Sequence, residues 1–176
     1  NGAKFGLATT LYEQGKKEIA SSYFESVFNT NDKELASKVF FNYANILRGG
    51  SGDDQITGGE GNDTINGGSG NDIINGQDGE DTITFGEQDN NINLALTSSQ
   101  NTGDGNDTIL SIENVNSGSG NDNVQGNATA NILNGQGGAD ILDGNGGDDT
   151  LNGGAGDDNL NGGTGNDSIS GGAGDD

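Results

Sequence analysis

The chain carries the nonapeptide Gly-Gly-Glu-Gly-Asn-Asp-Thr-Ile-Asn at residues 58–66, and Gly67 begins the same pattern again. The shared pattern is Gly-Gly-x-Gly-x-Asp-x-aliphatic-x. Its last three positions predict a very short strand with one inward side chain, because alternate residues of a strand face opposite sides. Its glycines allow positive φ and close approach of neighbouring backbones. The repeat therefore predicts a parallel coil of stacked short strands joined by glycine-rich turns.

Two blocks of the chain hold this repeat in register. In residues 49–84 the aliphatic position recurs at Ile56, Ile65, Ile74 and Ile83. In residues 117–176 it recurs at Val124, Leu133, Leu142, Leu151, Leu160 and Ile169. Between them, segment 85–116 is degenerate, and Ile109 follows Ile83 by 26 residues, one short of three repeats. We expect a slip of register there, with the segment either stacked on the coil or linking two coils.

The charge of the chain is divided as sharply as its repeats. Residues 49–176 hold 23 acidic residues and no Lys or Arg, whereas residues 1–48 hold six basic and five acidic residues. An acidic segment with few large apolar residues repels itself and stays unfolded until cations neutralise it. The negative charge excludes nucleic acid as a partner, and an anionic membrane would repel the segment as well. Membrane insertion is not expected, because no run approaches the roughly 20 apolar residues of a spanning helix.

Each repeat brings together oxygen atoms that suit a hard cation. The glycine turn exposes backbone carbonyl oxygens, and the aspartate at the sixth position adds a carboxylate. Ca²⁺ takes about six to eight such ligands, whereas Mg²⁺ demands a small octahedral site. Zinc is excluded in practice, because the chain has neither Cys nor His. The expected metal ligands are Asp54, Asp63, Asp72, Asp81, Asp107, Asp122, Asp140, Asp149, Asp158, Asp167 and Asp176.

The repeat resembles that of the RTX (repeats-in-toxin, hemolysin-type) family, strongly in residues 49–84 and 117–176 and weakly in 102–110. The resemblance implies a parallel β-roll in which each unit is half a turn and Ca²⁺ lies between turns. Sites would then pair aspartates two units apart: Asp54/Asp72, Asp63/Asp81, Asp122/Asp140, Asp140/Asp158, Asp149/Asp167 and Asp158/Asp176. Asn90 and Asn131 replace the aspartate in their units, so sites that rely on them should be weak or empty. About six or more Ca²⁺ ions are expected, and six would reduce the charge of −23 to about −11 and permit compaction.

Residues 1–48 have a different pattern, with apolar residues at helical spacing. They resemble a tetratricopeptide repeat at Leu7, Ala8, Leu11, Gly15, Ala20 and Phe24. The usual tryptophan and closing proline of that repeat are absent, and a generic helical hairpin is the alternative. Leu35, Val39, Tyr43 and Ile46 would line a third helix. This segment is a candidate for binding a protein partner.

The expected fold is therefore mainly β, a calcium-stacked parallel β-roll with a short α-helical N-terminal segment. Four parts are expected: a helical hairpin at 1–48, a first block at 49–84, an insert at 85–116 and a second block at 117–176. Because the chain begins without Met and ends inside a repeat, we interpret it as a fragment of a longer protein.

The expected function is calcium binding in a secreted bacterial protein. The resemblance implies export through a one-step, type I exporter, followed by folding outside the cell or at its surface. No catalytic residue is expected in these residues, because a zinc protease needs histidine ligands and the repeats make every acid equivalent. The alternatives are a non-catalytic accessory module of a secreted protease, lipase or alginate epimerase, and part of a surface adhesin.

Overall fold

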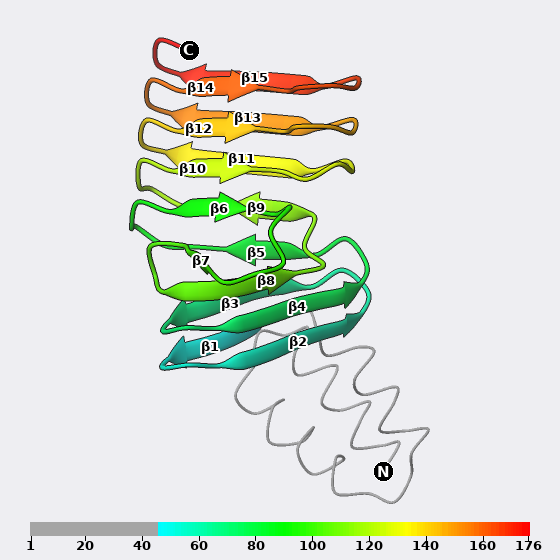
Figure 1. Cartoon of the computed structure of the whole chain (residues 1–176). Helices are drawn as coiled ribbons and strands as arrows, with labels where there is room; N and C mark the ends of the chain where they lie inside the picture. The colour runs from blue at the N-terminus through cyan, green and yellow to red at the C-terminus, as the bar shows by residue number, and fades with distance from the viewer. Residues whose placement is uncertain (1–45) are drawn as a thin grey trace, which may run out of the picture. The chain divides into compact units, whose positions relative to one another are not determined.

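The computed structural model describes residues 46–176, which form a solenoid of short strands (Figure 1). Most of the hairpin predicted at 1–48, with its tetratricopeptide-like positions, lies outside these residues. Leu47 and Arg48 lie in strand β1 (Leu47–Ser51), so the helical prediction is wrong at these two positions. The reason is the repeat itself: Leu47 pairs with Ile65 and so takes the aliphatic position of an additional unit.

The strands form two walls around a narrow core. One wall is a seven-stranded sheet. In spatial order it contains β1, β3 (Thr64–Ser69), β5 (Thr82–Thr84), β9 (Asn114–Asn116), β11 (Ile132–Gly137), β13 (Thr150–Ala155) and β15 (Ser168–Ala173). The other wall consists of two four-stranded sheets. The first contains β2 (Gln55–Glu60), β4 (Ile73–Asp78), β8 (Asn106–Leu110) and β7 (Gln100–Asn101); the second contains β6 (Asn91–Asn93), β10 (Asn123–Gln125), β12 (Ile141–Asp143) and β14 (Asn159–Asn161).

One aliphatic side chain per unit builds the core, as the sequence predicts, except that Ile169 in the last unit is 50% exposed. Leu133 lies beside Leu151 on the neighbouring strand, 18 residues later, and Val124 lies beside Leu142 in the same way. The buried row consists of Ile56, Ile65, Ile74, Ile83, Ile92, Ile109, Ile112, Val115, Val124, Leu133, Leu142 and Leu151. Each such side chain contributes about 1.5–3 kcal/mol when fully buried. Ordering a residue costs about 1–2 kcal/mol, so nine residues per unit need further stabilisation from the turns.

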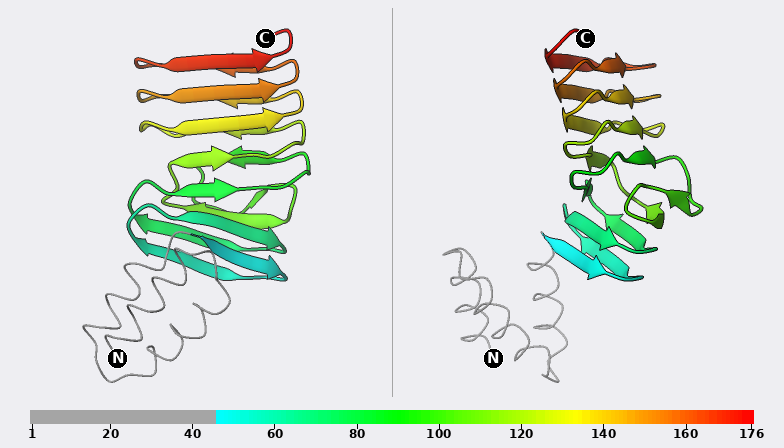
Figure 2. Two further views of the ribbon diagram at one scale, coloured as in Figure 1. Left: turned by 180° about the vertical axis from the view of Figure 1, so that it is seen from behind. Right: turned by 90° about the vertical axis from the view of Figure 1, so that its left-hand side faces the viewer.

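Segment 85–116 is stacked on the coil. Strand β9 lies between β5 and β11, so the seven-stranded sheet continues through the segment. Ile109 of β8 pairs with Ile74 of β4, 35 residues earlier. Four complete repeats would separate them by 36 residues, so the predicted slip of one residue is confirmed. The chain reaches β6 before it returns through β7 to β8, which lies next to the earlier strand β4. Figure 2 shows the tilt between the strands before and after this segment.

Candidate metal centres along the two edges

The glycine-rich turns line the two edges of the coil. Turns that lead into the seven-stranded sheet form the first edge, and turns that lead into the opposite wall form the second edge. On the first edge, Gly59 and Gly61 have φ angles of 117° and 101°, a region that side chains with a Cβ rarely adopt. Glycine is the residue that best suits these two positions, although Gln77 and Gln136 take a positive φ at the second position of their units.

The sixth-position aspartates form a buried ladder along each edge, which we call the inner ladder. The backbone N–H of Asp63 donates a hydrogen bond to Oδ1 of Asp81, one full turn later, at 2.7 Å. The corresponding bond from Asp140 to Asp158 measures 2.9 Å. All six predicted pairs are joined in this way: Asp54/Asp72, Asp63/Asp81, Asp122/Asp140, Asp140/Asp158, Asp149/Asp167 and Asp158/Asp176.

The second carboxylate oxygen of most of these aspartates has no partner. Among residues 46–176, the Oδ2 atom is buried without a hydrogen bond in Asp54, Asp63, Asp72, Asp81, Asp122, Asp140, Asp149 and Asp158. A buried polar atom left without a partner costs about 1–3 kcal/mol, and more when it is charged. Eight such atoms, in regular rows along the two edges, fit a positively charged ligand.

The glycine at the first position of each unit lets oxygen atoms approach the place where a side chain would begin. A Cβ built on Gly58 would lie 2.5 Å from both Asp63 Oδ2 and the carbonyl oxygen of Gly76. On Gly144 it would overlap Asp149 Oδ2 and lie 2.6 Å from the Gly162 carbonyl oxygen. A carboxylate oxygen and a carbonyl oxygen from the next turn thus converge on the space that the missing side chain leaves.

Burial makes the ionised form of these aspartates unfavourable without a cation. It raises the pKa of Asp63 to about 6, and the nearby charge of Asp81 adds to the shift. It also raises the pKa of Asp140 to about 6, with a further contribution from Asp122 and Asp158. The pKa values of Asp72, Asp81, Asp122 and Asp149 are raised chiefly by the same desolvation. A bound cation would reverse these shifts.

Carboxylates alone cannot complete a metal site in this coil. Within residues 46–176, no three Asp, Glu, His or Cys side chains gather around one point. An ion beside Asp63 Oδ2 would therefore need backbone carbonyl oxygens as well, such as that of Gly76. A set rich in carbonyl oxygens with few carboxylates fits the coordination of Ca²⁺.

The sequence matches one family in four overlapping or adjoining copies, at residues 41–74, 57–92, 116–151 and 152–176, which together cover more than half of the chain. The chain belongs to the RTX calcium-binding nonapeptide repeat family. A search of curated proteins finds no match to it. Its RTX repeats form a β-roll, and calcium is the ion that they bind.

Asp107 differs from the other aspartates of the RTX β-roll. Its Oδ1 accepts the Asp72 N–H at 2.8 Å, but its Oδ2 accepts a hydrogen bond from the Thr102 hydroxyl. The oxygen that other units leave without a partner is therefore satisfied by the protein here.

Glu113 is an inner-ladder residue that the sequence analysis missed. Its Oε2 accepts the Asp81 N–H at 2.9 Å, the role that Asp81 plays toward Asp63. The signal is present in the sequence, because Glu113 precedes Val115 by two residues, as each repeat aspartate precedes its aliphatic residue.

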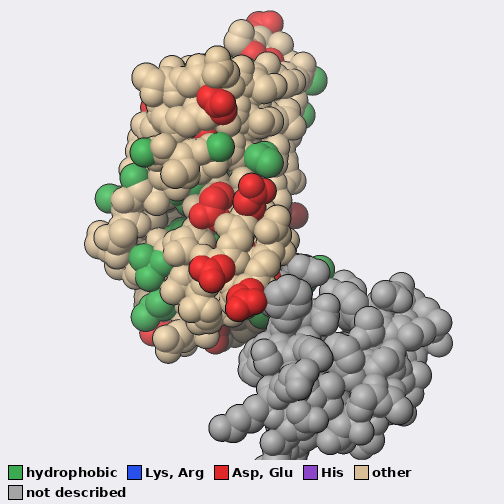
Figure 3. Space-filling view, turned by 90° about the vertical axis from the view of Figure 1, so that its right-hand side faces the viewer, with side chains coloured by type: hydrophobic (Ala, Val, Ile, Leu, Met, Phe, Trp, Pro, Cys, Tyr) green, Lys and Arg blue, Asp and Glu red, His purple; other side chains and the backbone are tan. Residues whose placement is uncertain are grey.

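The fifth-position residues form a second, exposed ladder, which we call the outer ladder. Here the side chain of one turn accepts a hydrogen bond from the backbone N–H of the following turn. The Asn71 N–H donates to Asp53 Oδ1, and the Asn166 N–H donates to Asp148 Oδ1, both at 2.8 Å. Asn and Asp serve equally, because only an acceptor is needed. Figure 3 shows acidic side chains exposed along one edge of the coil. The consensus treats this position as variable, so sequence analysis overlooked it.

Proposed function

We propose that this chain is a calcium-dependent folding module of a secreted bacterial protein. Eight buried carboxylate oxygens without partners carry the proposal, because they make the metal-free coil unfavourable at neutral pH. The module would stay unfolded at submicromolar calcium and fold at millimolar calcium, since extracellular calcium modules bind at about 10⁻⁴–10⁻³ M.

The proposed ligands are the sixth-position aspartates and first-position glycine carbonyls. Asp63 Oδ2 and the Gly76 carbonyl oxygen illustrate the pair, since both face the space beside Gly58. Several such ions along the two edges would offset much of the charge of −23 carried by residues 49–176.

Export in the unfolded state, through a type I exporter, is consistent with this design. Inside the cell the acidic repeats would lack their counter-charge and remain extended. Outside, calcium would drive folding. No helix in residues 46–176 is long and apolar enough to cross a membrane.

We propose a non-catalytic role for these residues. Their sixth-position carboxylates occupy equivalent places in a ladder, which suits a row of ions better than one reaction centre. A secreted enzyme or an adhesin would then carry this module as an accessory part, and residues 1–48 remain the candidate segment for a protein partner.

Circular dichroism during a calcium titration tests the proposal. We expect a coil-to-β transition that is cooperative in calcium and reversed by chelator. An unchanged spectrum would refute calcium-dependent folding.

Two isosteric variants test which aspartates bind the calcium that drives folding. Asp140→Asn removes a buried carboxylate oxygen, whereas Asp157→Asn makes the same charge change at an exposed outer-ladder residue that accepts the Asp175 N–H. We expect Asp140→Asn to raise the calcium midpoint roughly tenfold, equivalent to about 1.4 kcal/mol, and Asp157→Asn to leave it nearly unchanged. Equal midpoints for the two variants would contradict the proposed ligand set.

A further inference from the structure

Each inner ladder changes its bonding at one place. On the first edge this happens between Glu113 and Asn131. The Glu113 N–H donates to the Asp81 carbonyl oxygen at 3.2 Å, not to the side chain of the following turn. The bond that links one inner-ladder residue to the next is therefore replaced at this junction.

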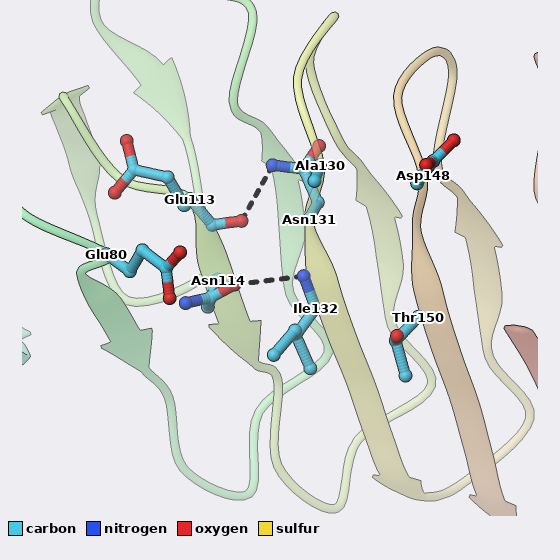
Figure 4. Close-up of a pocket in the computed structure, with 8 residues that line it drawn as sticks. All are labelled: Glu80, Glu113, Asn114, Ala130, Asn131, Ile132, Asp148 and Thr150. Carbon is cyan, nitrogen blue, oxygen red and sulfur yellow. Dashed lines mark hydrogen bonds between the residues drawn. The ribbon is translucent and has the colours of Figure 1, made fainter. Parts of the chain in front are cut away.

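Asn131 forms that replacement. Its Nδ2 donates to the Glu113 carbonyl oxygen at 2.7 Å, and its Oδ1 accepts the Asn127 N–H at 2.8 Å. The side chain is 2% exposed, so these bonds lie inside the coil. Figure 4 shows the bond to Glu113 and, beside it, the bond from Ile132 N–H to the Asn114 side chain.

The amide oxygen of Asn131 occupies the place that Oδ2 occupies in the aspartate turns. A Cβ built on Gly126 would overlap Asn131 Oδ1, as one on Gly144 would overlap Asp149 Oδ2. Asp149 Oδ2 has no hydrogen-bond partner there, whereas Asn131 Oδ1 accepts a hydrogen bond from the Asn127 N–H of its own turn. Both polar atoms of the amide are thus used by the protein.

The second edge contains a related junction between Asp107 and Asn90. Nδ2 of Asn90 donates to the Thr102 carbonyl oxygen at 2.9 Å, and Asn90 is 2% exposed. The Thr102 hydroxyl donates to Asp107 Oδ2, and Thr102 itself is fully buried. The Thr102 hydroxyl thus satisfies the carboxylate oxygen of Asp107, whereas Oδ1 of Asn90 is buried without a hydrogen bond, as Oδ2 is in the regular turns.

We propose that Asn131 is a built-in substitute for calcium on the first edge, and that the Thr102 hydroxyl plays the corresponding part at Asp107 on the second edge. The Asn127 N–H, which donates to the Asn131 amide oxygen, supplies the positive end of a dipole at the place where the regular turns would hold a cation. These two places, at Asn131 and at Asp107, would need no metal and would divide the calcium sites of each edge into an array before them and an array after them. The inference rests on the proposed function, since it assumes that the regular turns bind calcium.

Substitutions at Asn131 in the full chain test this proposal. Asn131→Asp puts a carboxylate oxygen against the Glu113 carbonyl in place of a donor, so we expect the calcium midpoint for folding to rise roughly tenfold. Asn121→Asp is the matched control, because it adds the same charge to an exposed outer-ladder residue that accepts the Ala139 N–H. Equal midpoints for the two variants would overturn the proposal.

Calcium counting by calorimetry and native mass spectrometry provides the second measurement. Asn131→Ala should bind as many Ca²⁺ ions as the unaltered chain, although it is less stable, whereas Asp149→Ala should bind fewer. A loss of bound calcium in Asn131→Ala would make Asn131 a ligand and overturn the proposal. If the unaltered chain itself binds no calcium, the proposed function fails, and this result is distinct from failure at Asn131 alone.

Discussion

The layers built from complete repeats and the layers built from residues 85–116 share one stacked aliphatic row but close their turns differently. In a complete repeat, Asp140 keeps a buried Oδ2 without a hydrogen bond beside a glycine turn. In the central layers, Asp107 receives the Thr102 hydroxyl instead. Under the proposed function, dependence on calcium would be a property of individual turns and not of the solenoid as a whole.

Gln100 shows how far the central layers rely on side-chain hydrogen bonds. Its Oε1 accepts the Asn93 N–H at 2.7 Å, and its Nε2 donates to the Asn93 carbonyl oxygen at 3.0 Å. The side-chain amide thus acts as a strand neighbour for β6, whose other side pairs with β10. This arrangement satisfies the backbone without an ion at a place where the sheet is interrupted.

The largest expected effect comes from filling the space in a complete repeat. In Gly135→Ala the new Cβ overlaps Asp140 Oδ2 and lies 2.6 Å from the Gly153 carbonyl oxygen. We expect the free energy of unfolding in saturating calcium to fall by about 3 kcal/mol or more, because overpacking adds to the loss of the ion site. Chemical denaturation in calcium measures this change.

Gly137→Ala in the same turn is the control. Its Cβ would meet only the Ala155 carbonyl oxygen, at 3.8 Å. The expected change is within about 0.5 kcal/mol. Comparable losses in the two variants would show that the space beside Asp140 has no special role.

A smaller effect is expected in the central layers, and it should not depend on calcium. Gln100→Ala leaves the Asn93 N–H and carbonyl without their partner. The expected loss in the free energy of unfolding is about 2 kcal/mol, from two hydrogen bonds of about 1 kcal/mol each. Gln88→Ala, at an exposed residue of the same segment, should have almost no effect. A loss that grows as calcium is lowered would contradict the distinction between the two kinds of layer.

The sequence predicts the regular half of this molecule well, because an identical unit meets an identical neighbour in every turn. The inward rows from Ile56 to Ile92 and from Val115 to Leu151 follow directly from the nine-residue period, whereas the pairing of aspartates one turn apart is what the RTX resemblance implies. The extent of the coil was underestimated at its start, since Leu47 already occupies an aliphatic position.

The irregular part could not be predicted in the same way. The sequence shows the slip before Ile109, but not the return of β8 to the side of β4, because that depends on the long-range pairing of β4 with β8. Asn131 was expected to weaken a site, and the sequence alone does not reveal that its amide bonds to Glu113. The asparagine at position 131 predicts the loss of a carboxylate ligand, whereas only the surrounding backbone shows which hydrogen bonds replace it.

The smallest expected effect concerns protons, which can satisfy the same oxygens as calcium. The folded pKa values of Asp63 and Asp140 are about 6, above the ordinary value of 3.8. The folded state therefore binds these protons more tightly than the unfolded state, so protonation stabilises the metal-free coil. This contribution is complete below pH 3.8 and is lost as the pH rises through about 6. In protein stripped of calcium, β structure should increase as the pH falls from about 7 to about 4.5, as measured by circular dichroism.

In saturating calcium the dependence should reverse, because protons then compete with the ion for the same carboxylates. The double variant Asp63→Asn and Asp140→Asn should flatten the slope in metal-free protein, since both groups lose their titrating proton. If acid instead reduces β structure in the stripped protein over this range, the carboxylate oxygens without partners are not what keeps the metal-free coil unfolded. If the double variant keeps the same dependence of β structure on pH, the general charge of the acidic repeats causes that dependence. The contrast between complete repeats and central layers would then have no electrostatic basis.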